Sequence, residues 1–258
     1  LHVQDLSYVD TTGVERVKSV SFSVRAGEVV GIAGVSGNGQ SELLSLLGGI
    51  LKPSKGGFSI AGHEVNAQHS ADPRQVRAMG LGHVPEDRHK MGLINRFEAQ
   101  EAFILGYHHL PAYNKGLLQD KTAILSDCQE KMEKWDVRPP IPTLKTANFS
   151  GGNQQKLVIA REVEQDPEVL LVGQPTRGVD IGAIEYIHQQ IIAMRDQGKA
   201  VLLVSVELDE IMSLSDRILV MADGRVVGEL DAARADEKTL GLMMANIVPD
   251  DIAQEAHS

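Results

Sequence analysis

Apolar and polar residues alternate in blocks that predict short strands followed by amphipathic helices. Residues 17–24 alternate apolar and polar side chains, as in a strand with one buried face, and residues 29–33 form a nearly all-apolar run. Such a run is typical of a strand buried on both faces in a parallel sheet. A glycine-rich loop follows at once, and residues 42–51 then carry apolar side chains at helical spacing. Strand, glycine loop and helix in this order are the context that a phosphate-binding loop requires.

Residues 90–147 differ in character from the segments on either side. They are richer in helix formers, include Trp135 and end in a proline cluster formed by Pro139, Pro140 and Pro142. We therefore expect a helical insertion that is joined to the core by a stiff linker.

A second group of core elements is predicted after residue 148. In chain order these are a helix over 154–165, a strand over 169–172, a helix over 183–197, a strand over 200–205, and a hairpin of 218–222 and 225–230. The order of elements predicts an α/β fold in a single domain. Its expected parts are a core of about 1–89 and 148–248, a helical subdomain of about 90–147, and a polar, frayed tail over 249–258.

Composition narrows the classes of function. The chain has 258 residues, of which 42% are hydrophobic and 23% charged, and no run approaches the roughly 20 apolar residues that span a bilayer. The first residues resemble no signal peptide, and the missing initiator Met indicates a segment of a longer chain. The single cysteine, Cys128, excludes an internal disulfide and fits a reducing compartment, as a buried small side chain. The net charge of −10, without a dense Lys/Arg block, argues against nucleic acid as a partner.

The loop after the first buried strand has the frame of a phosphate-binding loop. In an intact loop, backbone N–H groups surround the phosphates, a lysine neutralises their charge and a Ser or Thr hydroxyl holds Mg²⁺. Here Gln40 occupies the lysine position, whereas Ser41 keeps the hydroxyl. A charge-assisted hydrogen bond is about twice as strong as a neutral one, so we expect weakened nucleotide binding, with weak Mg²⁺ binding at Ser41. The alternative is a glycine-rich turn without a ligand. The candidate nucleotide-binding residues are Ser36, Gly37, Asn38, Gly39, Gln40, Ser41 and Glu42.

The buried strand over 169–172 ends in residues that do not support phosphoryl transfer. That chemistry needs a carboxylate near Mg²⁺ and a group that positions the attacking water. Gly173 has no side chain, and Gln174 has the shape of a glutamate but cannot accept a proton. We therefore predict that the chain's own site hydrolyses nucleotide slowly or not at all.

A Ser-Gly-Gly sequence stands at the start of the next predicted helix. The hydroxyl of Ser150 and the backbone N–H groups of Gly151 and Gly152 would form an anion site at a helix N-terminus. Such a site suits an anionic group such as a phosphate. The alternative is a glycine-rich N-cap that binds no ligand.

These motifs, in this order, resemble the nucleotide-binding domain of an ATP-binding cassette (ABC) transporter over essentially the whole chain. Residues 34–41 then correspond to Walker A, 149–155 to the signature loop, 168–175 to Walker B and 176–180 to the D-loop region. The resemblance implies a P-loop NTPase core with an N-terminal antiparallel β subdomain and a helical signature subdomain. After Gln40, Gly173 and Gln174, the resemblance adds a fourth departure from the catalytic residues of the family, because Val206 stands where the family has its switch histidine.

The resemblance also implies residue roles. Glu86 and Asp87 fall in the Q-loop and would contact membrane subunits, although both could also be solvated turn charges. Gly178 and Asp180 would belong to the D-loop. The signature residues offered in trans would be Phe149, Ser150, Gly151, Gly152, Asn153 and Gln154, and the degenerate positions are Gln40, Gly173, Gln174 and Val206.

The wording of the motifs narrows the resemblance further. Gly-Asn-Gly-Gln-Ser-Glu at 37–42 and Phe-Ser-Gly-Gly-Asn-Gln-Gln-Lys at 149–156 resemble the second cassette of twin-cassette ATPases that serve simple-sugar importers. The run over 174–188 is similar to the branch that handles nucleosides, and ribose- or galactose-type sugars remain open.

This resemblance implies that the chain binds ATP at a degenerate site and supplies its signature loop to a first cassette, which hydrolyses ATP. The first cassette is expected on the same full-length chain. The other implied partners are transmembrane permease subunits and, indirectly, an extracellular substrate-binding protein. The implied location is the cytoplasmic face of a bacterial plasma membrane. Two alternatives stay open: a competent ATPase that uses other groups, and a non-transport interaction protein on the same fold.

Overall fold

The computed structural model describes residues 1–247, which form two compact units. The first unit contains Leu1–His83, Pro167–Gln174 and the chain from Gln190 onward, and the second contains Val84–Asp166 and Pro175–Gln189. The second unit takes in more of the chain than the helical segment expected at 90–147. The domain boundaries given above therefore stay a prediction.

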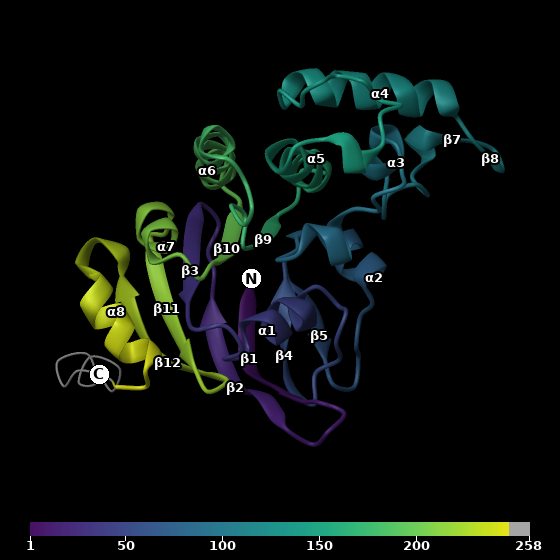
Figure 1. Cartoon of the computed structure of the whole chain (residues 1–258). Helices are drawn as coiled ribbons and strands as arrows, with labels where there is room; N and C mark the ends of the chain where they lie inside the picture. The colour runs from purple at the N-terminus through teal and green to yellow at the C-terminus, as the bar shows by residue number, and fades with distance from the viewer. Residues whose placement is uncertain (248–258) are drawn as a thin grey trace. The chain divides into compact units, whose positions relative to one another are not determined.

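Two sheets build the first unit (Figure 1). The antiparallel sheet has the order β2-β1-β4-β5, and its strands are β1 (His2–Val9), β2 (Glu15–Ser23), β4 (Lys55–Ile60) and β5 (His63–Asn66). The larger sheet has the order β12-β11-β3-β10-β9-β6, and its strands are β3 (Glu28–Ala33), β6 (Leu81–Val84), β9 (Val169–Gly173), β10 (Ala200–Val204), β11 (Arg217–Ala222) and β12 (Arg225–Asp231). Strand β3 pairs in parallel with β10 and β11, and β12 returns antiparallel to β11.

The central strands are buried on both faces, as their apolar runs predict. Every residue of β9 and β10 is buried, and in β3 only Glu28 is not. Since parallel strands are covered on both faces, a continuous apolar run rather than an alternating one is the expected pattern. The predicted strands and the closing hairpin are confirmed to within one or two residues.

The helices of the first unit are short. They are α1 (Gln40–Leu47), α2 (Pro73–Ala78), α7 (Leu208–Leu214), α8 (Glu237–Met244) and the end of α6 (Ile181–Asp196), with a 3₁₀ turn over Ala232–Arg234. Helix α1 starts two residues earlier than the predicted 42–51 and ends sooner. Gly39 adopts a left-handed φ of 98° as its N-cap, which allows the helix to begin at Gln40. Gln40 therefore lies in the first turn of α1.

The second unit is mainly helical. Its elements are α3 (Ala99–Phe103), α4 (Lys121–Lys134), α5 (Gly151–Val163), the start of α6, a π-helix over Arg88–Gly92, and 3₁₀ turns over Pro111–Tyr113 and Thr146–Asn148. It also contains a small hairpin of β7 (Asn114–Lys115) and β8 (Leu118–Gln119), which the sequence did not predict. Strands of two residues are too short to show an alternating pattern. Cys128 is buried as expected, and burial raises the pKa of its thiol to about 12.

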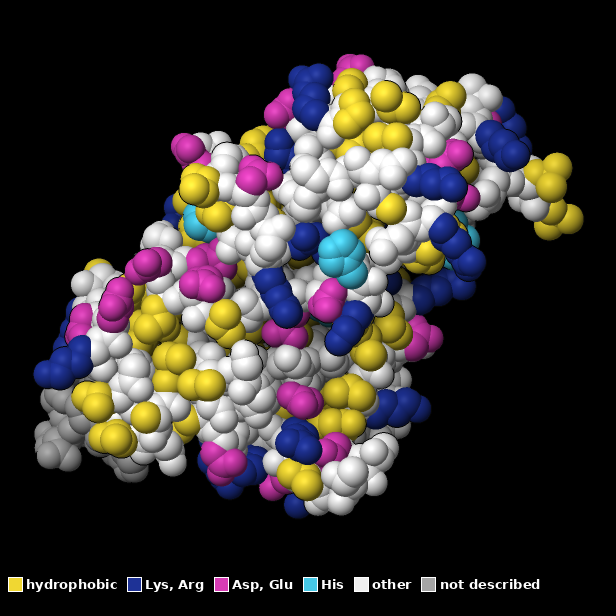
Figure 2. All heavy atoms as spheres, viewed as in Figure 1, with side chains coloured by type: hydrophobic (Ala, Val, Ile, Leu, Met, Phe, Trp, Pro, Cys, Tyr) yellow, Lys and Arg dark blue, Asp and Glu magenta, His cyan; other side chains and the backbone are white. Residues whose placement is uncertain are grey.

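Within residues 1–247, no helix is both long and apolar enough to span a membrane. On the face drawn in Figure 2, basic and acidic side chains are interspersed. The tail predicted over 249–258 lies outside the described residues.

Candidate functional site

Three loops of the first unit meet at one edge of the larger sheet. Ile32 of β3 is in register with Val204 of β10, which is in register with Gly173 of β9. Because these strands are parallel, the segments that follow them leave the sheet side by side at their carboxyl ends. Ligands of open α/β sheets bind at such an edge. The candidate phosphate loop, the segment of Gly173 and Gln174, and Val206 therefore follow neighbouring strands at this edge.

The phosphate loop is an open backbone cradle fixed at one side. Gly37 has a φ of +91°, and no atom lies within 4 Å of the position that a Cβ would take there. Gly39 has no such space, because a Cβ would lie 2.6 Å from the carbonyl oxygen of Arg16. The Asn38 carbonyl accepts a hydrogen bond from Gly224 N at 3.1 Å, and its side-chain Oδ1 accepts one from Asp223 N at 3.3 Å. The turn between β11 and β12 therefore holds the loop in shape.

The side-chain amide of Gln40 is turned into this loop. Its side chain is only 6% exposed, and Nε2 donates to the carbonyl oxygen of Val35 at 3.3 Å. A Cβ added to Gly34 would collide with the same Nε2, so the amide packs directly on the first glycine of the loop. The site therefore has backbone donors and the exposed hydroxyl of Ser41, but no cation at the lysine position.

The edge beside the phosphate loop offers neither a carboxylate nor an imidazole at the three expected positions, 173, 174 and 206. Gly173 is buried and has no side chain. Gln174 adopts a left-handed φ of 47°, and its Oε1 accepts a hydrogen bond from Val206 N at 3.4 Å. Val206 itself is 41% exposed and apolar. A neutral amide thus bridges the ends of β9 and β10, where the chemistry would need a base and a proton donor.

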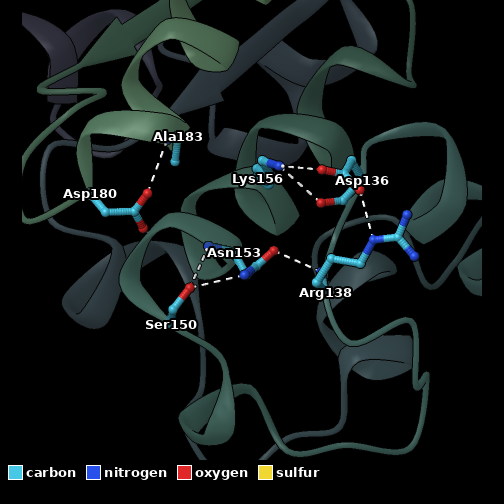
Figure 3. Close-up of polar contacts among 7 residues, drawn as sticks. All are labelled: Asp136, Arg138, Ser150, Asn153, Lys156, Asp180 and Ala183. Carbon is cyan, nitrogen blue, oxygen red and sulfur yellow. Dashed lines mark hydrogen bonds and ion pairs between the residues drawn. The ribbon is translucent and has the colours of Figure 1, made fainter.

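In the second unit, Ser150 caps α5. Its Oγ accepts from Asn153 N at 3.4 Å and from Asn153 Nδ2 at 2.9 Å, and Asn153 Oδ1 accepts from Arg138 N at 2.7 Å. Figure 3 shows these contacts. Helix α5 begins at Gly151, three residues before the predicted start at 154, because this cap precedes the glycines. The first N–H groups of a helix have no partner within it, so this N-terminus also keeps the geometry of an anion site.

The glycines of the signature loop are required by close packing against the D-loop region. A Cβ on Gly151 would lie 2.5 Å from the carbonyl oxygen of Gly178. A Cβ on Gly152 would lie 2.7 Å from both the Cβ of Ala183 and the Oδ2 of Asp180. The other carboxylate oxygen of Asp180 accepts from Ala183 N at 3.1 Å, at the start of α6 (Figure 3). The predicted D-loop and signature residues therefore lie together in one unit.

Of the two Q-loop carboxylates, Asp87 is directed toward its own segment. Its Oδ1 accepts from His89 N at 3.0 Å and from Lys90 N at 3.1 Å, which caps the π-helix. Burial alone would raise the pKa of Asp87, but the two backbone hydrogen bonds and the positive charges of Lys90 and Arg177 together lower the pKa. Glu86 is half-buried. Contact of either residue with a membrane subunit stays a prediction.

Two basic residues near the signature loop were not assigned from the sequence. Arg88 directly follows Glu86 and Asp87 in the Q-loop segment. Its guanidinium donates hydrogen bonds to the D-loop backbone and to α5. Lys156 of α5 donates to the backbone oxygen of Asp136 at 2.9 Å and lies 4.4 Å from the ring centroid of Tyr186. Both stand inside motifs, but their acceptors are distant in sequence, so spacing alone carried no signal for these contacts.

A metal site is not evident in the described part of the chain. No group of three or more His, Cys, Asp or Glu side chains within residues 1–247 is placed to hold an ion. Mg²⁺ in nucleotide sites commonly binds one or two carboxylates besides the phosphates. The phosphate loop supplies only the hydroxyl of Ser41. Its backbone thus fits nucleotide phosphates, whereas the residues present do not fit a complete Mg²⁺ site.

Three features together define a nucleotide-binding cassette. They are a phosphate loop after a central parallel strand, an accompanying antiparallel sheet, and a helical unit in which Ser-Gly-Gly begins α5. The chain belongs to the ABC transporter family, whose model, described as "ABC transporter", matches residues 17–177. It has the α/β cassette fold of that family, with an antiparallel β subdomain and a mixed sheet.

Similar proteins support this assignment. The chain is 42% identical over 244 residues to the nucleoside import ATP-binding protein NupA of Lactococcus lactis subsp. cremoris (strain MG1363), a match that covers 95% of this chain and 48% of NupA. It is also 42% identical over 245 residues to the guanosine import ATP-binding protein NupO of Bacillus subtilis (strain 168), with 95% and 48% covered. The chain therefore spans about half the length of these curated relatives.

Solved structures show the same fold. The dimeric structure of MJ0796, a bacterial ABC transporter cassette, matches with a TM-score of 0.72 at 24% identity, over 91% of this chain and 99% of that one. A post-hydrolysis structure of MJ0796 bound to ADP and Pi matches with a TM-score of 0.73, also at 24% identity and the same coverage.

Proposed function

We propose that this chain is the degenerate ATP-binding cassette of an importer for nucleosides or simple sugars. It binds ATP through the phosphate loop of its first unit and hydrolyses it slowly or not at all. The Ser150 end of α5 is supplied in trans to a partner cassette, where ATP is hydrolysed to drive transport. The chain thus contributes one half to each of two composite sites.

The observation that carries this proposal is the contrast between the two half-sites. In the first unit, Gln40 bonds to Val35, Gly173 has no side chain, and Gln174 bonds to the backbone of Val206. In the second unit, Ser150 caps a 13-residue helix whose glycines fit closely against the D-loop region. Losses of charge are confined to the half-site where hydrolysis would occur. The half-site that would serve another chain is fully built.

Nucleosides are the substrate class that we favour. The two relatives at 42% identity are named for nucleoside and guanosine import, whereas a glucose import ATP-binding protein of Haloferax volcanii is 39% identical and a ribose import one of Corynebacterium glutamicum 37%. The partners we propose are a catalytically competent first cassette, permease subunits that meet the segment of Glu86 and Asp87, and an extracellular substrate-binding protein. The proposed location is the cytoplasmic face of the plasma membrane.

ATP is proposed as the ligand of the phosphate loop, held by its backbone N–H groups, the open position at Gly37 and the N-terminus of α1. Gln40 adds no positive charge. Affinity should therefore depend on backbone donors more than on side chains.

The experiment that tests the in-trans contribution places Ser150→Arg in the full-length transporter. An arginine at the cap removes the hydroxyl and fills the space in front of α5, so ATP hydrolysis by the partner site should fall by about tenfold or more. Ser126→Arg adds the same side chain to an exposed position of α4 and should leave hydrolysis unchanged. Wild-type ATPase activity in the Ser150→Arg transporter would contradict the proposal.

A further inference from the structure

Arg88 joins three segments of the second unit through one side chain. Its Nη1 donates to the carbonyl oxygen of Arg177 at 2.6 Å, and its Nη2 donates to that of Gly178 at 3.0 Å. Its Nε donates to Oε1 of Gln154 on α5 at 3.3 Å. The planar guanidinium therefore contacts the D-loop by two hydrogen bonds and the signature helix by a third. A lysine cannot reproduce this fork.

The acceptor on α5 is itself held in orientation. Gln154 is 6% exposed, and its Nε2 donates to the carbonyl oxygen of Thr146 at 3.0 Å. This bond fixes the amide so that Oε1 faces Arg88. The contact is therefore a defined hydrogen bond between two elements rather than one of several that a mobile side chain could make.

The other end of the segment that contains Arg88 is also attached to α5. The carbonyl oxygen of Gly92, at the end of the π-helix, accepts from Nη1 of Arg161 at 2.7 Å. Arg161 is 2% exposed and pairs with Glu162, which is fully buried, at 2.8 Å. A Cβ on Gly92 would lie 3.2 Å from a methyl carbon of Val158. The segment thus lies along α5 and is bonded near both ends of this helix.

Arg88 bonds to the D-loop at the point where the D-loop packs against the signature glycines. The Gly178 carbonyl that accepts from Arg88 is the same atom that lies 2.5 Å from the Cβ position of Gly151. Nη2 of Arg88 lies 3.0 Å from the same Cβ position. A displacement of Gly178 therefore moves the atom against which the first residue of α5 is packed.

We propose that Arg88 is a positioning residue for the in-trans anion site: it converts a displacement of the segment at Glu86 and Asp87 into a displacement of the D-loop and of the Ser150 end of α5. The inference rests on the proposed function, because the anion site that Arg88 positions is the one that the proposed function places at Ser150. Arg88 touches no nucleotide. It acts by setting the distance between two loops, and a permease that moves its segment changes how well Ser150 and the N–H groups of α5 meet the partner's nucleotide.

The test compares Arg88→Lys and Arg88→Gln with Arg138→Lys in the full-length transporter. Arg138 is an arginine of the same unit whose guanidinium pairs with Asp136 and not with the D-loop backbone. Hydrogen exchange of the Gln154, Val179 and Ala183 amides measures the linkage. Substrate-stimulated ATP hydrolysis measures its consequence.

In both Arg88 variants we expect exchange of these amides to rise by about tenfold or more, because hydrogen bonds to a charged group are lost. The kcat of substrate-stimulated ATP hydrolysis should fall by about tenfold, while KM for ATP stays within about twofold. The reason is that the lost hydrogen bonds position the two loops and do not touch the nucleotide. Arg138→Lys should match the wild type in both measurements. A general loss of stability would instead raise exchange throughout the chain and lower basal and stimulated rates together.

Ser150→Arg in the same assays separates the two proposals. If Ser150→Arg silences hydrolysis while the Arg88 variants keep wild-type stimulation, the proposed function stands and the assignment of Arg88 is overturned. It is overturned equally if exchange rises at these amides without any change in stimulated kcat. If Ser150→Arg leaves hydrolysis unchanged, the proposed function fails and the positioning assignment fails with it.

Discussion

We infer that Gln40 weakens phosphate binding while it leaves the shape of the loop intact. Lysine and glutamine have similar length, and the amide of Gln40 lies within the loop, where it donates to Val35 at 3.3 Å. The loop therefore keeps its shape, and the open backbone at Gly37 remains. What is missing is the positive charge that would oppose the phosphate oxygens. The defect is electrostatic rather than conformational.

Replacement of Gln40 by lysine should restore this charge. We expect Gln40→Lys to tighten ATP binding to the chain by about tenfold, because one charge-assisted bond replaces a neutral one and about 1.4 kcal/mol corresponds to tenfold in affinity. Gln40→Met is the matched control, since it removes the amide without adding charge and should change affinity by less than about threefold. Titration calorimetry with ATP measures both. Equal tightening by lysine and methionine would assign the effect to packing in the loop instead of charge.

The residues that sequence could not assign are those whose partners are backbone atoms far along the chain. The positions of Gln40, Gly173, Gln174 and Val206 at one sheet edge were predictable, because each follows a strand whose apolar run is plain. Arg88 stands in an equally visible motif, but two of its acceptors are carbonyl oxygens 89 and 90 residues away. Any residue type carries a carbonyl oxygen. No pattern of side chains can therefore predict the contact.

At the scale of elements, local rules located the strands well and the helix starts less well. Buried strands such as β9 and β10 are specified by their own apolar residues. The start of α5, by contrast, depends on Ser150 as a cap, and Gly151 and Gly152 carry no apolar periodicity that would mark a helix. The hairpin of β7 and β8 has too few residues for any period. Packing against neighbouring elements determines where such short or glycine-rich elements form.

The packing of α5 against α6 can be tested at its tightest point. Gly152→Ala would place a methyl group 2.7 Å from Ala183 and from Asp180, so we expect a loss of about 1–3 kcal/mol in the free energy of unfolding. Gly182→Ala is the control in the same unit. It lies in α6, where a Cβ meets only Asp180 Oδ1 at 3.7 Å, and it should stabilise by up to about 1 kcal/mol through helix propensity. Urea unfolding of both variants measures the difference, and a neutral Gly152→Ala would show that the two helices can separate without cost.

At the scale of the whole molecule, we propose that the two units carry halves of different sites. The phosphate loop, Gln174 and Val206 belong to the first unit, whereas Ser150, Gly178 and Arg88 belong to the second. Two cassettes that pair in this way form two composite sites. Only one of those two sites needs to remain catalytic in the assembly.

Repair of the degenerate half-site tests this division between two chains. The unmodified chain should turn over ATP well below the roughly 1 s⁻¹ typical of enzymes. The triple variant Gln40→Lys, Gly173→Asp, Gln174→Glu regains a cation, a carboxylate for Mg²⁺ and a group that positions water, so its turnover should rise by about tenfold or more. Its active unit must contain two copies, because each repaired loop still needs the Ser150 end of another chain. The rate per molecule should therefore rise with protein concentration, and adding Ser150→Arg to the triple variant should abolish the gain. A gain that is independent of concentration, or that survives Ser150→Arg, would mean that one chain completes its own site, and a turnover near 1 s⁻¹ in the unmodified chain would mean that the site was never degenerate.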